Sequence, residues 1–152
     1  MSAAGESRLP ARRVVARASL PQVIRPNLPG RGVYAAGGGL VSSAWRVVVD
    51  FGDGELRAGW TRRPSAPSYG PMEKETKRKL QAAEVAELQG LTEKAWRAPE
   101  PPLSPPIADY DEILIAVDRD DAFFLQGYGP IRAAEAEAVI DRLRALARQP
   151  QG

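Results

Sequence analysis

The strongest constraint on the fold is the pattern of apolar residues within residues 44–61. Apolar side chains recur at every second position over residues 45–51 and again over residues 56–60. Because successive side chains of a strand point to opposite faces, this period predicts two strands that share one apolar face. Between them, Asp53-Gly54 favours a hairpin turn of type I′, in which both central residues take positive φ. The segment therefore predicts a β-hairpin.

A second hairpin is expected over residues 112–128. Residues 112–118 are apolar on both faces, which is typical of a central strand that is covered on both sides. Residues 118–121, three of which are Asp, form the turn, and residues 122–128 form the returning strand.

Two segments have the apolar period of a helix. The first begins at Ala82, where Glu84 can accept a hydrogen bond from the N-cap amide, and it ends before Pro99. The second covers about residues 132–148. Each helix has an expected buried stripe: Val85, Leu88, Leu91, Ala95 and Trp96 in the first, and Ala136, Val139, Ile140, Leu143 and Leu146 or Ala147 in the second.

The remaining segments give weaker signals. Residues 13–19 could form a short strand, and the glycine-rich residues 30–39 predict a loop or a bulge. Residues 72–80 suit either a helix or a polar edge strand, whose charges would discourage aggregation through the edge. A proline-rich connector follows the first helix.

These elements predict an α+β fold: a two-layer sandwich in which an antiparallel sheet of four to six strands has both helices on one face. We expect a disordered basic arm over residues 1–12, one domain over 13–148 and a flexible tail over 149–152. A hairpin, a Gly-aromatic pair and a Leu- or Ile-X-Ala-Ala-Glu helix start occur twice, a match that a ββα repeat would produce. Shared local rules for starting a helix are the safer explanation. The arrangement is similar to that of many small bacterial α+β proteins, a likeness that implies no function.

The absence of two residue types excludes most common chemistry. The chain has no Cys and no His, so it has no disulfide, no thiolate nucleophile, no Ser-His-Asp triad and none of the usual zinc or haem sites. The turn at Asp118, Asp120 and Asp121 lacks the Gly and the final Glu of a calcium loop. A dinucleotide-binding motif needs a helix directly after its glycines. The glycines of residues 30–39 lead into an expected strand instead, so this motif is not indicated. We expect no metal and no cofactor.

Charge is unevenly distributed along the chain. Residues 1–31 carry six Arg against one Glu, a net charge of +5, whereas residues 100–128 carry a net charge of −6; the whole chain is +2. These two segments could pair within the molecule or face different partners. No apolar run is long enough to span a membrane and no signal segment is visible, so a cytoplasmic location is expected.

The leading functional hypothesis is a non-enzymatic protein-binding module of the inhibitor, immunity or accessory-subunit type. It would act through a face of the sheet or through the proline-rich connector. The doubly apolar second hairpin supplies the candidate partner-binding residues, which are Phe124, Tyr128 and Leu114.

Two alternatives remain open. Nucleic acid could bind through the basic arm and segment 61–79, where the candidate cations are Arg62, Arg63, Lys77, Arg78 and Lys79. A carboxylate-dependent enzyme would need two acids brought together, and the candidates are Asp109 and Asp111, with Tyr110 and Glu112 adjacent, near Glu55 or Asp50.

Overall fold

The computed structural model describes residues 14–148, apart from residues 23, 39–43, 62–71, 99–109, 128–130 and 132. The arm, the tail, the proline-rich connector and Asp109 therefore lie outside the described residues. The elements, in chain order, are β1 (Val14–Ala16), the 3₁₀ turns η1 (Arg17–Ser19) and η2 (Arg25–Asn27), β2 (Arg31–Gly38), β3 (Ala44–Asp50), β4 (Glu55–Thr61), β5 (Lys74–Lys79), α2 (Ala82–Arg97), β6 (Asp111–Asp118), β7 (Asp121–Gly127) and α3 (Ala134–Arg148).

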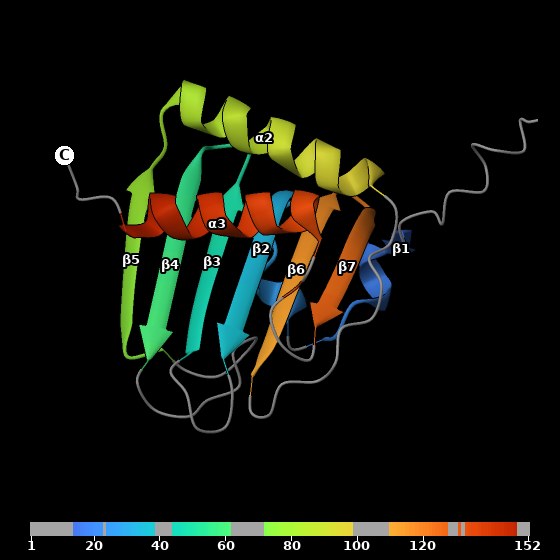
Figure 1. The fold of residues 1–152 in the computed structure, drawn as a ribbon, viewed down its shortest axis with the longest axis horizontal. Helices are drawn as coiled ribbons and strands as arrows, with labels where there is room; N and C mark the ends of the chain where they lie inside the picture. Colours follow the sequence, from blue (N-terminus) through green and yellow to red (C-terminus); the bar gives the residue numbers. More distant parts are fainter. Residues whose placement is uncertain are drawn as a thin grey trace, which may run out of the picture.

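The strands form one antiparallel sheet in the order β1-β7-β6-β2-β3-β4-β5, with both helices on the same face (Figure 1). The fold is therefore mixed α+β. The sheet has seven strands instead of the predicted four to six. The main reason is β2, which pairs with β3 on one side and β6 on the other and so joins the two predicted hairpins.

The glycines of β2 explain why its sequence is typical of a loop. A Cβ at Gly37 would lie 2.5 Å from the indole Nε1 of Trp45, and a Cβ at Gly32 would collide with the carbonyl oxygen of Val49. Glycine in a strand often marks such a close approach of neighbouring groups. The prediction of a loop or a bulge over residues 30–39 is therefore wrong over residues 31–38, which form a strand paired in continuous register on both sides, where the glycines make space for neighbouring groups.

Both predicted hairpins are present, as β3–β4 and β6–β7. The first turn differs from the predicted type I′, because Gly54 has a positive φ of 77° whereas Asp53 does not. The amide of Gly54 donates to the carbonyl of Asp50 (2.8 Å), so the turn is a longer loop with one left-handed residue. In the second hairpin the left-handed residue is Arg119, with φ of 59°.

The main core lies between the sheet and the two helices. Helix α2 contributes Leu88 and Ala95 to it, as predicted, and the buried stripe of α3 also agrees with the prediction. On the sheet side the core is formed by alternate residues of β7, β6, β2, β3 and β4. They include Val33, Val49, Leu56, Leu114 and Phe123.

The opposite face of the sheet has a second core, which the expected two-layer arrangement does not include. Leu20, Ile24 and Leu28 pack there against the other set of alternate strand residues, which include Tyr34, Val48, Ile113, Ile115 and Val117. The guanidinium of Arg17 fixes this segment by donating to the carbonyls of Pro29 (2.6 Å) and Leu28 (3.1 Å). Strand β6 is therefore covered on both faces, as its continuous apolar sequence predicts.

Of the two predictions for residues 72–80, the polar edge strand is confirmed. Strand β5 is the last strand of the sheet, pairs with β4 and is exposed at five of its six residues. It lies within the 61–79 segment, so the first hairpin is separated from its helix by an extra strand, whereas β7 leads to α3 after a short connection.

Candidate functional site

Five residues gather at the end of the sheet where β4 ends and β6 begins. We call this set the aromatic corner: Trp45, Trp60, Tyr110, Glu112 and Arg144. The strand register aligns Trp60 with Trp45, Trp45 with Gly37, and Gly37 with Glu112, so these residues form one row across four strands. Because the row shares the side-chain direction of Val47 and Leu114, it lies on the helix-covered face.

Hydrogen bonds connect most of the aromatic corner into a chain. The indole Nε1 of Trp45 donates to the hydroxyl of Tyr110 (3.4 Å), which donates to Oε2 of Glu112 (2.7 Å). The other carboxylate oxygen of Glu112 accepts from the backbone amide of Ile131 (3.0 Å), just before α3. Glu112 is only 7% exposed, so these bonds replace the water that its carboxylate would otherwise bind.

Two electrostatic effects support this chain of hydrogen bonds: the raised pKa of Tyr110 and the contact of Arg144 with Trp45. Burial, followed by the hydrogen bond to Glu112, raises the pKa of Tyr110 to about 12. The phenol therefore stays protonated and remains a donor across the physiological pH range. The guanidinium of Arg144, from α3, lies 4.5 Å from the ring centroid of Trp45, a cation–π contact that holds the indole in place.

Trp60 differs from its neighbours because 39% of its surface is exposed. It lies on the outer side of Trp45 and opposite Lys74 of the edge strand. The alternation of apolar residues predicts a core residue here. Strand β4 is next to the edge strand, and Trp60 lies close to its end, which the alternation of apolar residues does not report.

The predicted partner-binding residues lie in different environments. Leu114 is fully buried between the sheet and the helices, where it belongs to the main core. Phe124 is half-buried and packs against the second core, on the other face. Tyr128 lies outside the described residues.

The predicted nucleic-acid residues also separate. Arg62 and Arg63 lie outside the part of the chain that the structure describes. Lys77 and Lys79 point to the helix-free face, whereas Arg78 points to the helices. Arg78 forms an ion pair with Glu84 (3.2 Å) and donates to the carbonyl of Leu146 near the end of α3 (3.2 Å).

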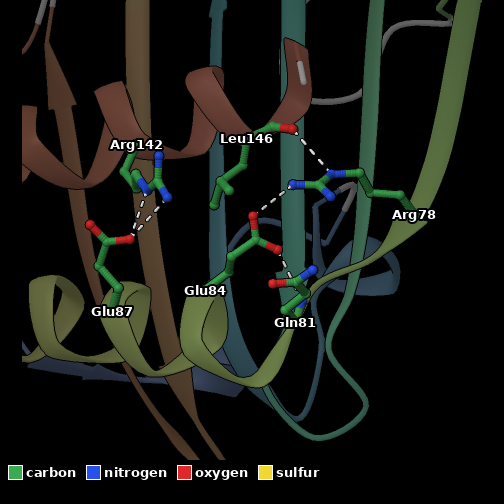
Figure 2. Close-up of polar contacts among 6 residues, drawn as sticks. All are labelled: Arg78, Gln81, Glu84, Glu87, Arg142 and Leu146. Carbon is green, nitrogen blue, oxygen red and sulfur yellow. Dashed lines mark hydrogen bonds and ion pairs between the residues drawn. The ribbon is translucent and has the colours of Figure 1, made fainter. Parts of the chain in front are cut away.

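Figure 2 shows that Arg78 is part of the attachment of both helices to the edge strand. Glu84 accepts from the Gln81 amide (2.9 Å), as predicted for the start of the helix. This hydrogen bond, with smaller contributions from Arg78, lowers the pKa of Glu84 although burial opposes the change. One turn along α2, Glu87 pairs with Arg142 of α3 (3.0 Å).

The structure keeps Asp111 apart from Asp50 and Glu55. Gly38 of β2 pairs with Asp111, whereas Gly32 pairs with Asp50. Six residues of strand separate these two positions, a distance of about 20 Å. Glu55 lies at the same end as Asp50, directly after the first turn, so neither acid is close to Asp111.

Within the described residues, an ion pair links the acidic turn to the basic N-terminal segment. Arg31 contacts Asp118 at 3.3 Å, and both side chains are more than half exposed. Among the described residues, no group of three or more potential ligands could hold a metal ion. None of the described helices is long and apolar enough to cross a membrane.

No protein-family model matches the chain, and no curated protein is significantly similar to it.

Proposed function

We propose that the chain is a non-enzymatic binding module that recognises another protein through the aromatic corner. The observation that carries this proposal is the exposed indole of Trp60, which lies beside a rigid hydrogen-bonded base. Tryptophan is enriched among the few residues that supply most of the free energy of protein–protein binding. An inhibitor, an immunity protein or an accessory subunit would each use such a surface.

The fixed geometry of the aromatic corner supports binding in preference to catalysis. Both oxygens of Glu112 already accept hydrogen bonds, and the raised pKa of Tyr110 keeps its proton in place. General acid–base catalysis needs a group whose pKa lies near the working pH. A preorganised surface, in contrast, lowers the entropy lost when a partner binds.

The test is affinity capture from an extract of the source organism with two matched variants. Trp60→Ser removes the exposed indole, and Val14→Ser removes the other large exposed hydrophobic side chain of the described residues, on the edge strand β1 at the far side of the sheet. A partner should be recovered in stoichiometric amount by the wild type and by Val14→Ser, and lost with Trp60→Ser. If no protein follows this pattern, the proposal is wrong.

The helix-free face supports a second candidate, nucleic-acid binding. Arg46, Arg57, Lys77 and Lys79 project from three adjacent strands there, although Glu55 and Glu75 lie among them. Binding through these cations would weaken steeply as salt rises, because counterions are released from the phosphates. Affinity that is unchanged between about 50 and 200 mM salt, or unchanged in Lys77→Gln/Lys79→Gln, would contradict this candidate.

A further inference from the structure

A small depression lies on the helix-free face, over strands β3, β4 and β5, and has a volume of about 40 Å³. Its floor is Gly59 of β4, which the strand register places between Arg46 of β3 and Glu75 of β5. Arg57 and Met72 also line it. The volume is about three times the least that holds one water molecule and far below that of sites for organic compounds. The depression therefore suits a small ion or the end group of a larger molecule.

Arg46 is the unusual residue of this depression. It is partly buried, and its guanidinium forms no hydrogen bond or ion pair with any described residue. Its Nη1 is buried, whereas Nε and Nη2, which lie side by side on one edge of the guanidinium, are accessible. Arg142 uses the same two nitrogens to contact one carboxylate oxygen of Glu87, each at 3.0 Å (Figure 2). Arg46 therefore presents an unused pair of donors that matches an oxyanion.

A second guanidinium borders the same depression. Arg46 is directly opposite Gly59, and Arg57 lies two residues along β4, a diagonal placement in which long side chains reach each other. The contacts of Arg57 are long: its Nη2 lies 3.4 Å from the carbonyl oxygen of Asn27, and its Nε lies 3.9 Å from Glu55. Like charges on neighbouring strands repel each other. An oxyanion held by both guanidiniums would remove this repulsion.

Glu75 determines which oxyanion suits the depression. It points to the same face, and the described residues include no ion pair between it and either arginine. Its carboxylate repels an anion without a proton, such as sulfate or a phosphodiester. A phosphate group that keeps a proton can instead donate a hydrogen bond to this carboxylate while its other oxygens accept from the guanidiniums. The charges therefore favour hydrogen phosphate or a phosphate monoester.

We propose that this depression binds a phosphate group that carries a proton, either as inorganic phosphate or as a monoester. Nε and Nη2 of Arg46 donate to its oxygens, Arg57 contacts a further oxygen, and the protonated oxygen donates to Glu75. Met72, whose Cγ would lie 2.8 Å from a Cβ at Gly59, forms an apolar wall. The site goes beyond the proposed protein-binding function, since it uses none of the residues of the aromatic corner, and its ligand differs from the phosphodiesters of nucleic acid.

The test follows amide chemical shifts of the labelled protein at constant ionic strength and about pH 6, near the second pKa of phosphate monoesters. Inorganic phosphate and methyl phosphate, which both carry a proton there, should bind saturably and shift the amides of residues 46, 57–59 and 75. The tighter of the two identifies the free ion or the monoester as the ligand. Sulfate and dimethyl phosphate, which carry none, should bind at least about tenfold more weakly.

Four variants separate this site from general attraction by positive charge. Arg46→Gln should weaken phosphate binding at least about tenfold, and Arg46→Lys, which keeps the charge but not the paired donors, about fivefold. Lys79→Gln removes the same charge from an exposed residue of β5 outside the depression, so its phosphate affinity should stay within about twofold of the wild type. Glu75→Gln, whose amide can donate to an oxygen, should reduce the preference for phosphate over sulfate.

Stability provides an independent measurement. Phosphate should raise the midpoint of thermal unfolding of the wild type and of Lys79→Gln more than that of Arg46→Gln, because it binds only the folded site. The proposal is overturned by phosphate shifts outside the depression, by no saturable binding of either phosphate, or by equal phosphate affinity in wild type and Arg46→Gln. Dimethyl phosphate that binds as tightly as methyl phosphate would also overturn it, and would favour the nucleic-acid candidate.

Discussion

Single residues of this protein often have a role that depends on one neighbour across the sheet. Gly37 is in a central strand because the indole of Trp45 occupies the space where a side chain would be. Gly90, in contrast, has open space around the position of a Cβ, so its helix tolerates glycine without needing it. The same residue type is therefore required at one site and replaceable at the other.

Substitution of these two glycines is expected to have opposite effects. Gly37→Ala should lower the free energy of unfolding by about 1–3 kcal/mol, because the added methyl collides with Trp45. Gly90→Ala should raise it by about 0.5–1 kcal/mol, the difference in helix propensity. Denaturant titration measures both, and a stabilising Gly37→Ala would contradict the contact with Trp45.

At the scale of elements, the helices are attached to the sheet by polar groups at the edge as well as by the core. Glu84 connects the start of α2 to Arg78, and Arg78 in turn donates to the end of α3 (Figure 2). Glu87 and Arg142 link the two helices directly. The side chain of Glu87 is 52% exposed and that of Glu84 only 17%, so the two acids should differ in their contribution to stability.

The contribution of Glu84 should depend on pH. Its folded pKa is lowered, so its stabilising effect is complete above the ordinary value of 4.5 and is lost as the pH falls through the folded value. Glu84→Gln should lower the free energy of unfolding by about 1–2 kcal/mol at pH 7 and by much less in acid.

The matched control on the same helix is Glu87→Gln, which removes an exposed ion pair and should cost less than about 1 kcal/mol at pH 7. Urea titrations of the three proteins across the acidic range measure these differences. An effect of Glu84→Gln that is independent of pH would show that the carboxylate is not held by Gln81 and Arg78.

The whole molecule has cores on both faces of one sheet. The helices cover one face, and the segment that contains Leu20, Ile24 and Leu28 covers the central part of the other. Alternate residues of β2 and β6 contribute to each core, so the two cores share the same strands. Loss of either cover should therefore destabilise the entire sheet.

Truncation on either side should consequently have a similar effect. Ile24 and Ile140 lie on opposite sides of the sheet and are 3% and 4% exposed. Ile24→Ala and Ile140→Ala should each lower the free energy of unfolding by about 2–4 kcal/mol, through lost apolar contact and a residual cavity. Far-ultraviolet circular dichroism and tryptophan fluorescence should give coincident unfolding curves for both variants. A small effect of Ile24→Ala would mean that its segment is only loosely attached.

The sequence alone determined the local elements, because local rules produce them. The period of apolar residues predicted the first hairpin and both helices. The continuous apolar run of residues 112–118 predicted the first strand of the second hairpin, covered on both faces. The lysines of residues 72–80 suit the edge strand β5, but the composition of this segment suits a helix equally well. These signals require no knowledge of any distant residue.

Only the tertiary structure decided what depends on residues far apart in the chain. Gly37 belongs to a strand because of Trp45 and β6, and Arg78 faces α3, 68 positions away. The aromatic corner likewise combines side chains from separate elements. The period of apolar residues indicates which way each side chain points. Its exposure and its contacts depend on where the other elements end.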